Sequence, residues 1–228
     1  MCGRITQQLS TDQIGELYGV QATPLPPDRL PRYNGAPGQD FIACLVEQHG
    51  ARAIARLRWG LVPSWARDAR TGSRLINARA ESVHYKPSFR AAFRRRRCLL
   101  PVDGWFEWQQ TGRRKQPYFL TLKDGSPLSF AALWECWDQG DSPLETFTII
   151  TTVASPGLKD LHHRQPAIID PRWFSNWLDP RTPLPELLEL ARQPYDGPFQ
   201  RRAVSSRVNS VRNDDQDILT PLSDSGLF

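Results

Sequence analysis

Short runs of mainly hydrophobic residues, separated by polar turn residues, recur along the chain and predict β-strands. Residues 41–47 and 51–59 form two such runs on either side of Gln48-His49-Gly50, which predicts a hairpin. Further strands are predicted at residues 98–102, 117–122, 130–136, 146–152 and 167–170. Residues 76–81 also read as an extended segment, because its polar residues alternate with small ones.

A longer apolar spacing predicts a few short helices. Residues 11–18 place Ile14, Leu17 and Tyr18 on one face, and we expect Thr11 to cap the first turn. Further helices are predicted at residues 88–97, after Asp170-Pro171, and at 185–192. The helix at 88–97 ends in four arginines, which we interpret as a solvated helix end, with phosphate contact as the second reading.

Between these elements lie three informative connections. Residues 23–31 are rich in proline and predict an extended surface segment. Residues 32–38 predict a loop whose glycines permit close approach of a ligand. Residues 59–65 predict an irregular loop with two tryptophans, of which we assign Trp59 to the core and Trp65 to a stacking platform for unpaired bases.

Many strands and few helices predict an α+β fold: a single domain, residues 1–228, built on an antiparallel, barrel-like sheet core with short peripheral helices. We expect the C-terminal tail from about residue 216 to be mobile. The sequence contains no apolar run long enough for a membrane span and no charged-then-apolar leader, so no membrane partner is expected.

Composition adds charge and thiols to this picture. The net charge is +5, and lysine supplies only four of the 29 basic residues. Arginine suits phosphate recognition, although genomic base composition produces the same bias. The four cysteines are scattered without a C-x-x-C pair, which argues against a zinc site and favours free thiols in an intracellular protein.

The first residues carry the most specific chemistry. If Met1 is removed, Cys2 presents an α-amine and a thiol on adjacent carbons, with reference pKa values of roughly 7.7–8.0 and about 8.5. Such an aminothiol can form an imine with an aldehyde and then close a five-membered thiazolidine through sulfur. The alternative is a cysteine of no consequence at a frayed terminus, but the predicted helix follows closely and ties the terminus to the fold.

Two interior stretches offer acid–base groups. Alternation along 103–108 places Trp105 and Glu107 on one face of a strand, so Glu107 lies either at a rim or in an apolar pocket that would raise its pKa. His162 and His163 would point to opposite faces of a strand, which disfavours a shared metal and favours one histidine as an acid or base.

Short motifs follow one another along nearly the whole chain: Met1-Cys2-Gly3-Arg4, Arg32-Tyr33-Asn34, Ala36-Pro37-Gly38, Trp59-Gly60-Leu61 with Pro63 and Trp65, Asn77-Ala78-Arg79-Ala80-Glu81, Asp103-Gly104-Trp105-Phe106-Glu107-Trp108, His162 with Arg164 and Pro166, Val204-Ser205, Val208-Asn209 and Asn213-Asp214. Taken together and in this order, they resemble the SRAP family, the SOS-response-associated peptidases or abasic-site processing proteins.

The resemblance implies a sensor that crosslinks Cys2 to abasic sites in single-stranded DNA after Met1 removal, with autopeptidase and lyase-type Schiff-base chemistry. It implies that Asn77 positions the sugar or the terminus, Glu107 shuttles protons and His162 assists ring opening. DNA contacts are implied for Arg4, Asn34, Pro37, Trp65, Arg79, Arg164, Ser205 and Asn209.

The resemblance further implies a monomer without cofactor or metal, in the cytoplasm and at the nucleoid when bound to DNA. Two other functions fit parts of the sequence. An N-terminal-nucleophile hydrolase, such as a glutamine amidohydrolase, would use the thiol of Cys2 on an amide and would need an oxyanion hole. A non-covalent single-strand binder would use the arginines and tryptophans alone.

Overall fold

The structure is a computed structural model that describes residues 2–21, 30–47, 50–112 and 114–222. Met1, most of the predicted connection at 23–31 and the Gln48-His49 pair of the predicted turn lie outside the described residues. The strands are β1 (Ile5–Gln7), β2 (Arg32–Gly35), β3 (Asp40–Val46), β4 (Arg52–Trp59), β5 (Asn77–Arg79), β6 (Arg97–Val102), β7 (Gly104–Thr111), β8 (Arg114–Leu122), β9 (Leu128–Trp137), β10 (Leu144–Val153), β11 (Arg164–Pro166) and β12 (Phe199–Ala203). The α-helices are α1 (Thr11–Tyr18), α2 (Arg90–Arg95), α3 (Phe174–Leu178) and α4 (Leu184–Arg192), and the 3-10 helices are η1 (Ala69–Arg74), η2 (Pro156–Leu158), η3 (Pro171–Trp173), η4 (Ser206–Asn209) and η5 (Gln216–Leu219).

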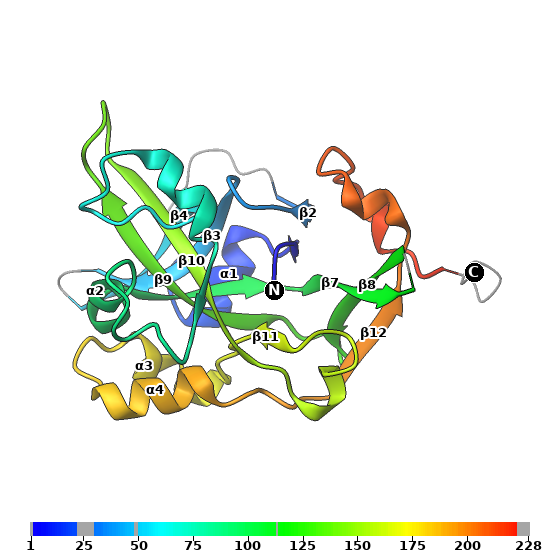
Figure 1. Ribbon diagram of the computed structural model, residues 1–228. Coiled ribbons are helices and arrows are strands. Elements are labelled where there is room, and N and C mark those ends of the chain that lie inside the picture. Colours follow the sequence, from blue (N-terminus) through cyan, green and yellow to red (C-terminus); the bar gives the residue numbers. More distant parts are fainter. Residues whose placement is uncertain (1, 22–29, 48–49, 113, 223–228) are drawn as a thin grey trace.

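Five strands close into a barrel in the order β10-β4-β3-β6-β9, and β9 pairs back to β10 (Figure 1). Its pairings are antiparallel except where β4 runs parallel to β10. Closure satisfies the backbone groups that an open sheet would leave at its edges. The predicted α+β, barrel-like fold with short peripheral helices is confirmed.

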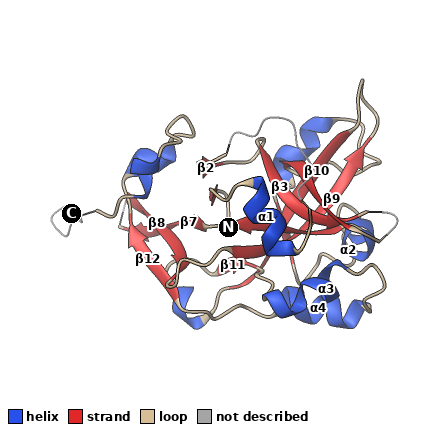
Figure 2. Cartoon of the chain, turned by 180° about the vertical axis from the view of Figure 1, so that it is seen from behind, coloured by secondary structure: helices blue, strands red, loops and turns tan. Residues whose placement is uncertain are grey.

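A second sheet, in the order β12-β8-β7-β1-β2, lies beside the barrel. Cys2 is buried in one apolar cluster with residues of both sheets, among them Trp59 from the barrel and Trp105 from β7. Helices α3 and α4 lie at one end of the molecule and the C-terminal segment lies at the other (Figures 1 and 2). The N-terminal residues therefore enter the fold where the two sheets meet.

Helix α1 has the predicted bounds but a different cap. Ser10, not Thr11, is the N-cap: its side chain accepts from the N–H of Gln13, and the side chain of Gln13 accepts from the N–H of Ser10. The helix ends at Gly19, whose φ of 65° lies in the left-handed region that glycine tolerates. The structure thus corrects the predicted cap by one residue.

Three predicted elements differ in the structure. Residues 32–35 form β2 instead of a loop, because their backbone pairs with β1. The predicted strand at 167–170 is replaced by β11, which pairs with the end of β10 beyond its last contact with β9. The end of the helix predicted at 88–97 is also wrong, since Arg97 belongs to β6 and is 3% exposed.

Arg97 is consequently not part of a solvated helix end. Its guanidinium donates to the carbonyls of Phe93, Arg94, Trp177 and Asp179 at 2.6–2.8 Å, so it ties α2 to α3. Burial lowers its pKa to about 10. The C-terminal segment from residue 216 begins with η5, where Ile218 is buried, and residues 223–228 lie outside the described residues. Within the described residues, no helix is long and apolar enough to cross a membrane.

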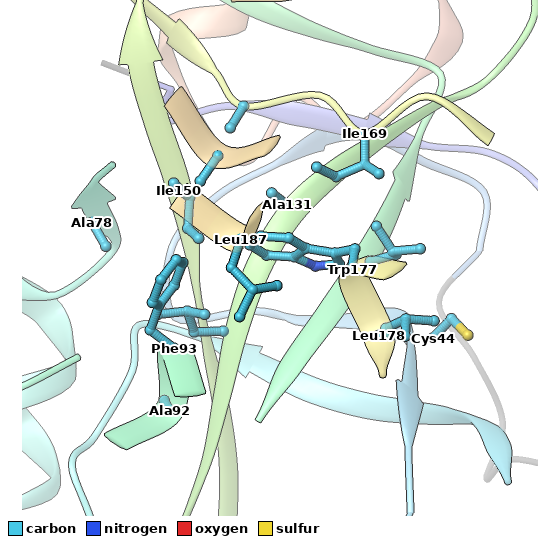
Figure 3. Packing of buried hydrophobic residues seen from close by; sticks show 14 of the residues in the cluster. Cys44, Ala78, Ala92, Phe93, Ala131, Ile150, Ile169, Trp177, Leu178 and Leu187 are labelled. Carbon is cyan, nitrogen blue, oxygen red and sulfur yellow. The ribbon is translucent and has the colours of Figure 1, made fainter. Parts of the chain in front are cut away.

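Trp177 is the centre of the apolar cluster under α3 and α4 (Figure 3). Its side chain is fully buried, its Nε1 donates to the carbonyl of Cys98 at 3.0 Å, and its ring meets Phe93 edge-on at 6.1 Å. Trp177→Ala is expected to lower the free energy of unfolding by about 3–5 kcal/mol, because it leaves a large cavity and an unpaired carbonyl.

Urea unfolding followed by circular dichroism measures this loss. Trp173→Ala is the matched control, since Trp173 lies four residues earlier and is 42% exposed. It is expected to change stability by less than about 1 kcal/mol. Equal losses for the two variants would show that Trp177 does not organise this cluster.

Candidate active site

The N-terminal strand places Cys2 beside Glu107. Strand β1 pairs antiparallel with β7 so that Ile5 faces Trp105, and the N–H of Phe106 donates to the carbonyl of Arg4 at 2.9 Å. If this register continues for two more residues, Gly3, the neighbour of Cys2, lies opposite Glu107. Cys2 is fully buried and Glu107 is 4% exposed, and the carboxylate is near enough to raise the pKa of the Cys2 thiol.

Glu107 carries a buried carboxyl group on β7. From the sequence, the Glu107 side chain lies either at a rim or in an apolar pocket. Its burial supports the apolar pocket. Burial raises the pKa of Glu107 to about 7, which lets the carboxyl group both accept and donate a proton near neutral pH. Phe106, with the opposite orientation on β7, packs instead into the cluster under the C-terminal segment.

The thiol of Cys2 is neutral at pH 7. Burial, and secondly the nearby carboxylate of Glu107, raise the pKa of the thiol well above its ordinary value, against a hydrogen bond from the N–H of Arg4 that lowers it. A buried neutral thiol is a poor first nucleophile. The geometry therefore suits an order in which an amine reacts first and the sulfur adds second.

Asn77 holds the backbone of Cys2. Its Nδ2 donates to the carbonyl of Cys2 at 2.7 Å, and strand β5 is itself fixed by parallel pairing with β10, where Asn77 faces Ile149. Its Oδ1 is buried and accepts no hydrogen bond from the part of the chain that the structure describes. Asn77 therefore orients the terminus through one amide atom and presents an acceptor through the other.

His162 lies in the loop between η2 and β11. Its Nδ1 accepts from the N–H of Arg164 at 2.9 Å, which orients the ring, and burial lowers its pKa. The rings of His162 and His163 stack with centroids 4.4 Å apart, so the prediction that they point to opposite faces is wrong; the pair lies outside a strand. Among the described residues, no cluster of three His, Cys, Asp or Glu side chains could hold a metal ion.

Gln109 is a residue of this site that the sequence reasoning missed. It follows Glu107 by two positions on β7, and its Nε2 donates to the carbonyl of Asp160 at 3.2 Å. This contact holds the histidine loop against the strand that carries Glu107. The alternation along β7 could have placed Gln109 on the face of Glu107, but no local signal indicates the partner 51 residues away.

The residues expected to bind DNA divide into an exposed and a buried group. Trp65 is 63% exposed, and Trp59 is 1% exposed in the core, as predicted. Arg79 and Asn209 are also exposed, whereas Pro37 and Ser205 are half-buried. Asn209 accepts from Trp108 Nε1 at 2.8 Å, and Ser205 caps η4 by accepting from the N–H of Arg207.

The other three lie inward. Arg164 is 8% exposed and forms a bidentate ion pair with Glu81, at 2.7 and 3.0 Å. Asn34 is fully buried, and Arg4 is half-buried with Nη1 donating to Asn34 Oδ1 at 2.7 Å.

All four cysteines have free thiols, which confirms the expectation from the sequence that they form no disulfide.

Comparison with known proteins adds a family to this geometry. The family model described as SOS response associated peptidase (SRAP) matches residues 1–211. "Abasic site processing protein YoqW" of Bacillus subtilis (strain 168) is 36% identical over 222 residues, covering 96% of this chain and 99% of that protein. "Abasic site processing protein YedK" of Escherichia coli (strain K12) is 30% identical and covers 97% and 100%. A crystal structure of a protein from Bacteroides thetaiotaomicron superposes with a TM-score of 0.84 at 26% identity, covering 97% of this chain and all of that one.

Proposed function

Because the chain belongs to the SOS response associated peptidase (SRAP) family, we propose that it recognises abasic sites in single-stranded DNA and shields them by a covalent bond to Cys2. The observation that carries this proposal is the burial of both Cys2 and Glu107 at the start of β1 and on β7, with the carboxyl pKa of Glu107 raised to about 7. The names of the relatives, abasic site processing proteins, support the substrate.

The reaction begins when hydrolysis of the Met1–Cys2 peptide bond frees the α-amine of Cys2, by autoproteolysis in our proposal. Asn77 holds the Cys2 carbonyl while the carboxylate of Glu107 takes a proton from the terminal ammonium. His162 transfers the proton that opens the deoxyribose ring and exposes its C1 aldehyde.

The free amine then attacks the aldehyde carbon, and one water leaves as the imine forms. Protonated Glu107 supplies the proton for the departing oxygen. The sulfur of Cys2 adds to the imine carbon and its proton passes to the nitrogen, which closes the thiazolidine without further loss of atoms. The ring protects the sugar from hydrolysis and from the elimination that would cleave the strand.

We place the DNA over the exposed side of the site. Trp65 offers an aromatic face for stacking an unpaired base, and Arg79 offers a guanidinium for a phosphate. The net charge of +5 favours this polyanionic partner. The inward residues Arg4, Asn34 and Arg164 make hydrogen bonds inside the protein.

The test is intact mass spectrometry and a denaturing gel of the wild-type protein with single-stranded DNA that carries one abasic site. We expect a heat-stable adduct whose mass equals protein without Met1 plus DNA minus one water. The same DNA with its aldehyde reduced by borohydride serves as the control and should give no adduct. Absence of the adduct from protein that has lost Met1 would refute the proposal, and glutamine hydrolysis would then be assayed.

A further inference from the structure

The C-terminal segment carries an acidic residue that holds the N-terminal half of the chain. Asp214 Oδ1 accepts from the backbone N–H groups of Tyr33 and Asn34, both at 2.7 Å, and its Oδ2 lies 3.5 Å from Arg32 Nη1. A carboxylate that accepts two N–H groups and faces a buried guanidinium is a strong, charge-assisted contact. It joins β2 to a segment about 180 residues away in the chain.

The side chain of Asn34 contacts both the C-terminal segment and Arg4. Its Nδ2 lies within hydrogen-bond distance of the carbonyls of Val208, Ser210 and Asn213, at 2.7–3.2 Å, and its Oδ1 accepts from Arg4 Nη1. The same Arg4 nitrogen also donates to the carbonyl of Val208 at 2.6 Å. The amide of Asn34 is therefore occupied by the protein itself, although the sequence suggested it for DNA.

Arg4 connects this network to the reactive residue. Its backbone carbonyl accepts from Phe106 in the β1–β7 register, and its own N–H contacts the sulfur of Cys2. The far side of the segment is fixed by Val208 and Ile218, which pack against Phe106. We call the contacts of Arg4, Asn34, Val208 and Asp214 the C-terminal latch. The latch holds the chain at Arg4, between Cys2 and β1.

We infer that Asp214 is a positioning residue, which, through Asn34 and Arg4, fixes Cys2 in the geometry needed for attack on the sugar aldehyde. The inference rests on the proposed function. Asp214 lies outside the pocket and does not act on the substrate itself. Its effect is to restrict the motion of β1, and small displacements of a reacting group slow a reaction strongly.

The test compares Asp214→Ala and Asp214→Asn with Asp217→Ala, a matched control that removes an exposed acid three residues further along. Crosslinking is followed in single turnover across a range of abasic DNA concentrations. Asp214→Ala is expected to slow the rate at saturating DNA by at least about tenfold and to change the half-saturating concentration by less than about twofold. Asp214→Asn keeps the Oδ1 acceptor and is expected to recover part of the rate, whereas Asp217→Ala should match wild type.

A second readout needs no DNA. Iodoacetamide labelling of the Cys2 thiol, read from the N-terminal peptide by mass spectrometry, is expected to be about tenfold faster in Asp214→Ala than in wild type or Asp217→Ala, because a loosened β1 exposes a buried side chain.

Wild-type crosslinking and labelling rates in Asp214→Ala would overturn the inference. A loss of affinity with an unchanged maximal rate would also overturn it, because that result would make Asp214 a DNA-binding determinant. If Asp214→Ala does not fold, Asp214→Asn decides by the same criteria. If the wild-type protein forms no adduct, the proposed function fails, and the labelling rates alone decide whether the latch holds Cys2.

Discussion

Cys2→Ala is expected to abolish the heat-stable adduct with abasic single-stranded DNA. The variant keeps a terminal amine but has no sulfur to close a ring, so any imine that it forms remains open to hydrolysis. Non-covalent binding should stay within about twofold of wild type, since Cys2 is fully buried and the exposed Trp65 and Arg79 remain in place. A denaturing gel after heating measures the adduct, and fluorescence anisotropy measures binding.

Cys2→Ser separates the roles of the amine and the sulfur. It retains the amine and places an oxygen, a weaker nucleophile than sulfur, at the second position. We expect an adduct that borohydride traps as a secondary amine but that heating destroys without the reductant. A heat-stable adduct of Cys2→Ala at the wild-type level would show that another residue attacks the sugar, and peptide mapping of that adduct would identify it.

Glu107→Gln is expected to slow crosslinking by about 10²–10⁴-fold, the range typical of a lost acid–base group. Wild type should show a rate that rises with pH through about 7, because the carboxylate form takes the proton from the Cys2 ammonium. The rate of the variant should not rise near pH 7. It should follow only the titration of the amine itself, whose pKa lies near 7.7–8.0 in reference peptides. Single-turnover rates between pH 5.5 and 9 would measure both profiles.

Glu107→Gln slows crosslinking in this prediction, but it should not lower the free energy of unfolding. Burial raises the pKa of Glu107 in the folded state from 4.5 to about 7, so the folded protein binds a proton that the unfolded chain has already released. Between these values, wild type loses stability as pH rises, by up to roughly 3 kcal/mol. The neutral amide avoids this loss, so Glu107→Gln should be at least as stable as wild type at pH 8.

Urea unfolding of wild type and Glu107→Gln at pH 5 and pH 8 measures this difference. Asp103→Asn is a useful comparison, because burial also raises the pKa of Asp103, which lies directly before β7, while its carboxylate accepts from the N–H of Gln8. It should leave the pH profile of crosslinking unchanged. An inflexion near pH 7 that persists in Glu107→Gln would assign the titration to another group.

Much of the architecture follows from local patterns in the sequence. Short runs rich in apolar residues predicted the barrel strands β3, β4, β6, β9 and β10 to within a few residues, and several of these strands are buried along most of their length. The alternation of side chains along a strand placed Glu107 on the face opposite Phe106. The bounds of helix α1 were predicted equally well, although its N-cap is Ser10 and not the adjacent Thr11.

The sequence failed where long-range pairing overrides local preference. Residues 32–35 carry turn chemistry, yet they form β2 because β1 offers them an open edge. Arg97 ends a basic run, yet it is buried because four carbonyl oxygens from α2 and α3 replace its water.

The sequence by itself determined the kinds of chemistry available: an aminothiol at Cys2, a carboxyl group at Glu107 and an amide at Asn77. These depend on residue identity alone. Only the tertiary structure decided that Asn77 binds the carbonyl of Cys2, that Glu107 is shielded from water, and that the amide of Asn34 binds carbonyls of the C-terminal segment. The physical reason is that a pKa and a hydrogen bond depend on solvent exclusion and on distances of a few ångströms between strands far apart in the chain, which no local pattern encodes.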